Sequence, residues 1–264
     1  MSARAAVRAR GVAVALGGRA ILHGVDLDAA PGQLTAIVGP NGSGKTTLLR
    51  ALAGLVEFSG QVDAGDLDVR ASSPAARAQR VAYLPQSSEL RAMLGVREVV
   101  ALGRYAARPG FFGRTRSDDG AVEQALTRVG VQGLARDPYP TLSGGQKRLV
   151  LLARALATGA STLLLDEPTA SLDIQHSLEL FELLGSLAAE GYTVVVVLHD
   201  LDDVQRHAAH AVLLEAGRVQ VAGAPLSASF VEAAERTYGV VLVAADRLGF
   251  RLRRGAAGAG EPAC

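Results

Sequence analysis

Polar and apolar residues alternate along residues 7–30, with a turn signal at Gly17-Gly18, and this pattern predicts short antiparallel strands. The next apolar run, residues 34–39 (LTAIVG), is short and ends in glycine, which is typical of a parallel strand buried on both faces. A helix is expected to follow from Lys45 to about Leu55. The chain therefore begins with an antiparallel region and continues into a strand–helix unit.

The middle of the chain changes from strand spacing to helix spacing. Residues 59–85 form strand-like pieces, whereas the segment from about 87 to 140 has apolar positions at helical intervals. Two helices are expected in it, over 96–107 and 118–130, separated by a loop rich in glycine, proline and aromatic residues at 108–115. This segment predicts a helical insertion between strands.

The last third of the chain returns to buried strands. Residues 161–168 and 193–200 hold two apolar strands, with an amphipathic helix around Ser177–Glu190 between them. A hairpin over 211–223 and a short helix near 229–238 precede a weak strand region. Strands alternating with helices predict an α/β fold with a mostly parallel core sheet, and ligands of such sheets bind at the carboxyl ends of the strands.

Composition narrows the classes of function. The 264 residues carry 27 Lys+Arg and 26 Asp+Glu, a net charge of +1, which does not favour a nucleic-acid partner. No apolar run approaches the roughly 20 residues of a membrane helix, and the N-terminal segment has no apolar region of the kind that marks a signal peptide. With Cys264 as its one cysteine, we expect a cytoplasmic protein.

The strand–helix unit carries a phosphate-binding loop. The stretch GPNGSGKTT at 39–47 matches the pattern G-x-x-x-x-G-K-[ST] between the expected strand and helix. Its glycines allow backbone N–H groups to curl around phosphate, Lys45 is expected to reach the β- and γ-phosphates, and Thr46 is expected to ligate Mg²⁺. The predicted nucleotide-binding residues of this loop are Gly39, Pro40, Asn41, Gly42, Ser43, Gly44, Lys45, Thr46 and Thr47.

Charged residues also follow the two later buried strands. Asp166 is expected to hold Mg²⁺ and Glu167 to activate the water that attacks the γ-phosphate, because both stand at the same sheet edge as the phosphate loop. His199 follows the strand at 193–197; it has either a structural role or, at this edge, a contact with the γ-phosphate. Glu167, His199 and Lys45 are the predicted catalytic residues.

The stretch TLSGGQKR at 141–148 precedes the apolar run LVLLARALA and is typical of a helix N-terminus with little side-chain bulk. Two glycines after a serine weaken a helix, so the pattern indicates that another group approaches this backbone closely. A serine hydroxyl and glycine N–H groups at a helix N-terminus can form an anion cradle.

Together, the ordered motifs GPNGSGKTT, YLPQ, LSGGQKR, LLLDEP, ASLD and VLHD resemble those of the ATPase subunits of ABC transporters, over about residues 5–250. The resemblance implies a P-loop NTPase fold with an antiparallel β lobe, within a domain at 1–254 whose helical subdomain spans about 87–145; residues 255–264 are expected to be a disordered tail. It also implies that Gln86 ligates Mg²⁺ with Thr46 and Asp166, and that Asp173 contacts an opposite subunit.

The same resemblance implies a homodimer in which the cradle of one subunit covers the ATP of the other. The residues that it assigns to this contact are Ser143, Gly144, Gly145 and Gln146. One chain has one phosphate loop and one cradle, so two chains related by two-fold symmetry would form two sites. ATP binding would close the pair, and hydrolysis would open it.

The helical insertion, with LGRY at Leu102–Tyr105, is similar to that of importers for iron–siderophore, haem and cobalamin. This implies integral membrane permease subunits as partners, a substrate-binding protein acting indirectly, and a peripheral position at the cytoplasmic face of the membrane. A transport ATPase for another solute and a soluble ABC ATPase are the alternatives. Leu16 stands where similar subunits place an aromatic residue against adenine, so GTP hydrolysis is also open.

Overall fold

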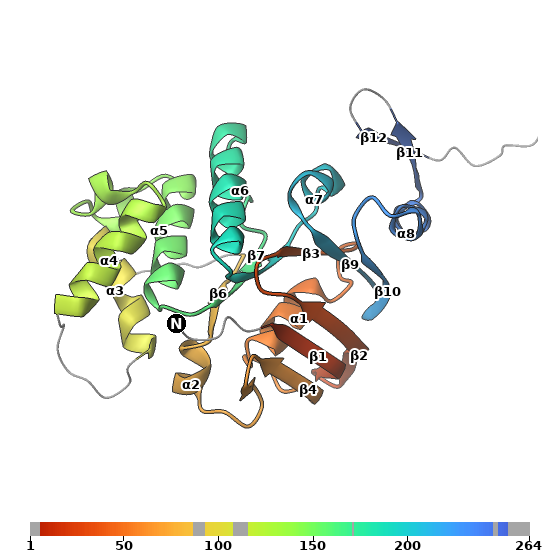
Figure 1. Ribbon diagram of the computed structural model, residues 1–264, viewed down its shortest axis with the longest axis horizontal. Helices are drawn as coiled ribbons and strands as arrows, with labels where there is room; N and C mark the ends of the chain where they lie inside the picture. The colour runs from red at the N-terminus through yellow and green to blue at the C-terminus, as the bar shows by residue number, and fades with distance from the viewer. Residues whose placement is uncertain (1–5, 87–92, 108–115, 171, 245–247, 253–264) are drawn as a thin grey trace, which may run out of the picture.

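The computed structural model describes residues 6–86, 93–107, 116–170, 172–244 and 248–252 (Figure 1). Its centre is a six-stranded sheet in the order β10-β9-β3-β8-β7-β6, parallel throughout except for the antiparallel pair β9 and β10. The strands are β3 Leu34–Val38, β6 Val81–Leu84, β7 Thr162–Asp166, β8 Thr193–Val197, β9 His210–Glu215 and β10 Arg218–Gly223. The mostly parallel core is therefore confirmed.

The central strands are apolar because helices and a second sheet cover both faces. Every residue of β3, β7 and β8 is buried. In β8, Val194 and Val196 pack into the hydrophobic cluster on one face, and Val195 and Val197 pack into the cluster on the other. Side chains of successive strand residues point to opposite faces, so a continuous apolar run suits this position.

One cluster lies under an antiparallel sheet of order β2-β1-β4-β5. Its strands are β1 Val7–Leu16, β2 Arg19–Ala29, β4 Ser59–Ala64 and β5 Leu67–Asp68. Helix α1 (Lys45–Leu52) contributes to the same cluster and contacts both sheets, below the central sheet in Figure 1. The antiparallel lobe is as expected, although β1 and β2 run to 10 and 11 residues, longer than predicted.

The expected helical insertion forms a group of helices at one end of the sheet, on the left in Figure 1. Helices α3 (Val96–Ala107) and α4 (Arg116–Arg128) both pack on α5 (Gly144–Ala157). The close contact of α3 with α5 depends on Gly103, where a Cβ would lie 2.2 Å from the Arg154 carbonyl oxygen. Two 3₁₀ turns, Gln132–Leu134 and Tyr139–Thr141, lead into α5.

The remaining helices differ from expectation mainly in their ends. Helix α6 (Ile174–Ala189) begins before the predicted Ser177 because the Asp173 side chain caps it by accepting from the His176 N–H at 2.8 Å. Two short helices, α2 (Pro74–Ala78) and α7 (Leu201–His207), were not predicted. The chain continues with α8 (Ala228–Tyr238) and a hairpin of β11 (Val240–Ala244) and β12 (Leu248–Leu252).

The predicted domain limits stay predictions. The start of the helical subdomain at 87, the loop at 108–115 and the tail at 255–264 fall outside the described residues.

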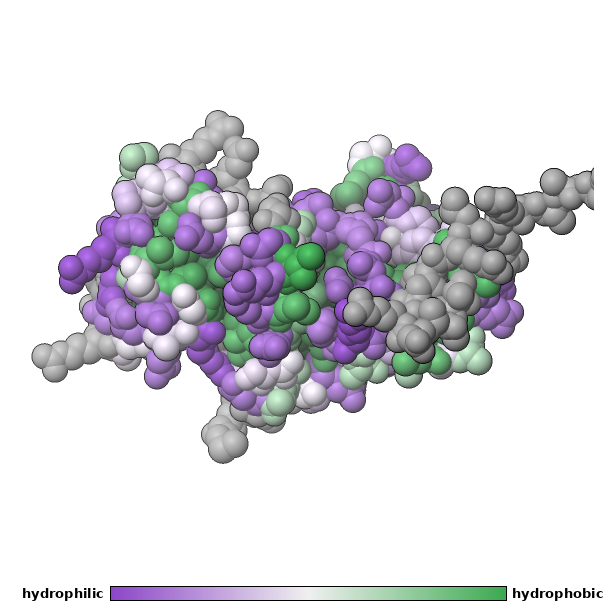
Figure 2. Space-filling view, turned by 90° about the horizontal axis from the view of Figure 1, so that it is seen from above, coloured by the Kyte–Doolittle hydropathy of each residue, from purple (hydrophilic) through white to green (hydrophobic). Residues whose placement is uncertain are grey.

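In the described parts of the chain, no helix combines the length and apolar character needed to cross a bilayer. The face seen in Figure 2 mixes hydrophilic and apolar side chains.

Candidate nucleotide site

The phosphate loop connects β3 to α1 at the carboxyl edge of the sheet. Gly39, Gly42 and Gly44 have φ values of 151°, 77° and 102°, in the region that favours glycine. A Cβ on Gly39 would lie 1.9 Å from the Leu214 carbonyl oxygen of β9, so both the conformation and the packing require glycine there. The sheet therefore determines the path of the loop.

Two polar groups of this loop are suited to an anionic ligand. Lys45, the first residue of α1, is 6% exposed, and its Nζ donates to the carbonyls of Gly39 at 2.7 Å and Pro40 at 2.9 Å. Burial lowers the pKa of this ammonium. The Ser43 hydroxyl is buried and has no hydrogen-bond partner among the described residues. A phosphate would supply acceptors to both groups, so the loop fits that ligand.

The turn between β9 and β10 supports the loop from outside. Gly217 donates its N–H to the Ser43 carbonyl at 3.0 Å, and its own carbonyl accepts from the His23 N–H at 3.0 Å. Gly217 has a φ of 74°, and a Cβ there would lie 2.1 Å from the Ile21 carbonyl oxygen. The hairpin thus ties the phosphate loop to β2.

A buried carboxylate lies beside the start of α1. Asp166, the last residue of β7, is fully buried and accepts from the Thr46 hydroxyl at 3.2 Å and the Tyr83 hydroxyl at 3.3 Å. Burial raises the pKa of this carboxyl. A carboxylate and a hydroxyl are oxygen ligands of the kind that Mg²⁺ binds, so Asp166 and Thr46 fit the predicted metal. Tyr83 was not predicted to belong to the site.

Three of the predicted side chains meet directly. Glu167 accepts from the Gln86 amide at 2.6 Å through one carboxylate oxygen and contacts His199 Nε2 through the other. Its side chain is 14% exposed, against 46% for His199. Glu167 has a φ of 48°, an uncommon conformation for a residue with a side chain. The structure therefore brings together the candidate base, the candidate metal-ligating glutamine and the histidine.

These residues surround a cleft of about 550 Å³. Its lining residues are Ile21, Asn41, Gly42, Gly44, Lys45, Thr46, Thr47, Gln86, Glu167 and His199. Ile21 of β2 was not predicted; it is the aliphatic side chain beside the loop, whereas Leu16 is 43% exposed at the end of β1 and outside the lining. The alternation of apolar residues along β2 was the available signal for Ile21.

The turn at 143–146, which starts α5 and is called the signature turn below, does not line this cleft. Ser143 and Gln146 form a capping box: the Ser143 hydroxyl accepts from the Gln146 N–H at 3.2 Å, and the Gln146 side chain accepts from the Ser143 N–H at 3.0 Å. Gly144 and Gly145 belong to α5, and Ser143 and Gly144 are exposed. Within one chain, therefore, the two glycine-rich turns do not share a site.

Comparison with known proteins agrees with this geometry. The profile of the ABC transporter family matches residues 22–170. The hemin import ATP-binding protein HmuV of Rhizobium meliloti is 40% identical over 242 residues, covering 88% of this chain and 91% of that protein. The ferric enterobactin transport ATP-binding protein FepC of Escherichia coli is 38% identical over 240 residues, covering 89% and 88%. The cobalamin import ATP-binding protein BtuD of Halobacterium salinarum is 43% identical over 219 residues, 82% of this chain and 54% of that protein.

Solved structures share the fold. An inward-facing ABC transporter described as of the metal-chelate type superposes with a TM-score of 0.78 at 24% identity, covering 93% of this chain and 95% of that one. A dimeric bacterial ABC transporter cassette superposes with a TM-score of 0.74 at 27% identity, covering 84% and 99%.

Proposed function

The chain belongs to the ABC transporter family and is an ATPase, and from this premise we propose that it powers an importer of iron–siderophore, haem or cobalamin. The observation that carries the catalytic part is the cleft itself, in which Lys45, Thr46, Gln86, Glu167 and His199 lie together. The import class rests on the relatives named for hemin, enterobactin and cobalamin.

The chain's own groups suit hydrolysis of the γ-phosphate bond. Lys45 would exchange its two carbonyl acceptors for phosphate oxygens, and Asp166, Thr46 and Gln86 would hold Mg²⁺, which neutralises phosphate charge. Glu167 would take the proton of the attacking water. Gln86 and His199, which both contact the Glu167 carboxylate, would orient it, so the carboxylate is placed before the substrate arrives.

The active form is a homodimer in this proposal. The signature turn is exposed and apart from the cleft, although a serine and glycines at a helix start suit an anion. Two chains arranged head to tail would place Ser143, Gly144 and Gly145 of each over the nucleotide of the other. ATP would then hold the dimer closed, and Asp173, the exposed cap of α6, would lie at the contact.

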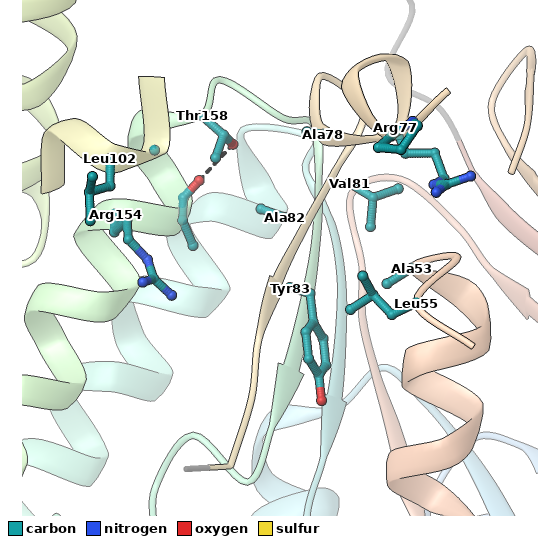
Figure 3. Close-up of a pocket in the computed structure, with 13 residues that line it drawn as sticks. Ala53, Leu55, Arg77, Ala78, Val81, Ala82, Tyr83, Leu102, Arg154 and Thr158 are labelled. Carbon is teal, nitrogen blue, oxygen red and sulfur yellow. Dashed lines mark hydrogen bonds between the residues drawn. The ribbon is translucent and has the colours of Figure 1, made fainter. Parts of the chain in front are cut away.

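A second groove is the proposed docking surface for the membrane permease. It measures about 390 Å³ and lies between the central sheet and the helical group. Figure 3 shows Leu102 and Arg154 on one side, Ala53 and Leu55 on the other, and Tyr83 between them. Leu55 is 58% exposed, which suits an apolar partner segment. Tyr83 also donates to Asp166, so one side chain joins this groove to the nucleotide site.

The enzymatic part is tested with Glu167→Gln. We expect this variant to bind ATP, to hydrolyse it about 100-fold more slowly or worse because the base is lost, and to elute as a dimer with ATP and Mg²⁺. Lys45→Ala should lose nucleotide affinity, and Ser143→Arg added to Glu167→Gln should remove the dimer. A Glu167→Gln variant that stays monomeric with ATP and Mg²⁺ contradicts the composite site.

The transport part is tested by affinity purification from native membranes. We expect a polytopic membrane protein to co-purify with the chain and to be lost with Leu55→Glu, because the exposed apolar side chain that would contact the partner is replaced by a charge. Leu226→Glu is the matched control, since Leu226 is 56% exposed and lies outside the groove. Recovery of the membrane protein with both variants would exclude this groove, and its absence with the parent would favour a soluble role. The co-purified substrate-binding protein would separate the proposed import class from another solute.

A further inference from the structure

An arginine occupies the buried face of α5, the helix that starts with the signature turn. Arg148 is 7% exposed and lies on the side of α5 that also carries Leu151, Leu152 and Ala155. Burial lowers the pKa of its guanidinium. A buried charge is costly unless it is hydrogen-bonded, so we expect the N–H groups of this guanidinium to have acceptors.

Among the described residues, the Arg148 guanidinium donates to backbone carbonyls of two segments of the nucleotide site, residues 166–168 and residues 85–86. Its Nη2 donates to Asp166 at 2.6 Å and to Glu167 at 3.0 Å, and its Nε donates to Pro168 at 3.3 Å. Its Nη1 donates to Gln86 at 3.1 Å and also to Pro85. Because the guanidinium is planar and rigid, it fixes these carbonyls relative to one another.

The first segment contains the strained backbone of Glu167. Its φ of 48° is unfavourable in a residue with a side chain, so surrounding contacts have to maintain it. Arg148 donates to the carbonyl of Glu167 and to those of its two neighbours, Asp166 and Pro168. The helix therefore holds the backbone from which the candidate base projects.

The second segment, residues 85–86, lies just beyond the point where β6 and β7 stop pairing. The β6–β7 ladder ends at the pair Leu84 and Leu165, and both segments continue past it into the cleft. The 2.6 Å bond from Gln86 to Glu167 requires these extensions to keep their separation. Arg148 bonds to both extensions and spans the gap beyond the ladder.

We propose that Arg148 is a positioning residue for ATP hydrolysis, which holds the backbones of Gln86 and Glu167 so that the Glu167 carboxylate meets the attacking water. The inference rests on the proposed role of Glu167 and adds how that carboxylate is aimed. Arg148 touches neither nucleotide nor metal in this proposal; it acts through Glu167. Because α5 starts at Ser143, the helix that carries the signature turn also carries this clamp.

The test is a double-mutant cycle on ATP hydrolysis by the full chain. Arg148→Met keeps the apolar stem of the side chain. It should lower kcat about tenfold or more while KM for ATP changes less than about twofold, because only the orientation of the Glu167 carboxylate is lost. Added to Glu167→Gln, it should change kcat less than about twofold, because the group it positions is already absent. Arg148→Lys keeps the charge with three donors and should recover part of kcat.

Arg104→Met is the matched control. Arg104 is also largely buried and donates to the Ala157 carbonyl at 2.8 Å, at the other end of α5 from the cleft, and to Asp118 at 2.9 Å. It should match the loss of thermal stability of Arg148→Met and retain the parental kcat. Equal losses of kcat in both variants, or an additive loss in the double variant, would overturn the role of Arg148. Parental kcat in Glu167→Gln would instead overturn the proposed base.

Discussion

Two helices of this protein start with glycine-rich turns, and their glycines meet different needs. At the start of α1, Gly39 and Gly44 have φ values of 151° and 102°, and Gly44 caps the helix with no side-chain hydrogen bond. At the start of α5, Gly144 has helical geometry, and a closed capping box surrounds it. In the first turn glycine is needed for the shape of the backbone, whereas in the second it leaves an exposed surface bare.

The charged residues next to the two turns are used differently. Arg148 of α5 donates to backbone carbonyls and is buried, so it is not open to a ligand. The phosphate loop gathers the buried Lys45 and lies beside the buried Asp166, whereas Ser143 and Gly144 are exposed. Buried charges need partners, and a phosphate with Mg²⁺ would supply them for both Lys45 and Asp166. The first turn thus belongs to a cleft whose buried charges suit a phosphate and Mg²⁺ bound by the same chain. The second turn is an exposed surface that suits a ligand bound by a partner.

The largest expected difference between the two turns comes from adding one methyl group to each. Gly39→Ala would place a Cβ 1.9 Å from the Leu214 carbonyl oxygen, so the loop must move. Hydrogen bonds to a charged group contribute about 1.5–3 kcal/mol each, so losing one of them should lower nucleotide affinity by about 10- to 100-fold. Fluorescence titration with a labelled ATP measures it.

Gly144→Ala is the matched change in the signature turn. An exposed alanine is favoured over glycine in a helix by about 0.5–1 kcal/mol, so the melting temperature should rise and the chain's own nucleotide affinity should stay unchanged. ATP hydrolysis should nevertheless fall, because the methyl group would crowd the partner's nucleotide. If both alanine variants lose nucleotide affinity equally, the two turns are not distinct in the way described.

Sequence patterns predicted the parts of this fold in which apolar residues form continuous runs or recur at regular spacing. Continuous apolar runs located β3, β7 and β8, and their carboxyl ends led to Lys45 and Glu167 in one cleft. Helices α2 and α7, of five and seven residues, are too short to show helical spacing and were missed. Helix ends depended on local caps such as Asp173.

Side chains that act between elements were not predictable in this way. Tyr83 lies in strand β6, and the position of Asp166 at the end of the neighbouring strand β7 gives its hydroxyl a role in the site. Arg148 stands within the quoted motif, but its five carbonyl acceptors come from segments 18 to 63 residues away in the sequence. The available signals were a charged residue on the buried face of α5 for Arg148 and, for the capping box, the three-residue spacing of Ser143 and Gln146.

The smallest expected difference comes from the one serine in each turn. Ser143→Ala removes the cap of α5, so the free energy of unfolding should fall by about 1 kcal/mol, while the stabilisation of the monomeric chain by its own ATP should not change. Ser43→Ala removes a buried hydroxyl that has no partner among the described residues, so the nucleotide-free protein should lose no stability. Its stabilisation by ATP should shrink, because the hydroxyl is then missing from the phosphate loop. Urea unfolding with and without ATP measures all four values, and a stability loss in nucleotide-free Ser43→Ala equal to that in Ser143→Ala would show that both serines serve the fold alone.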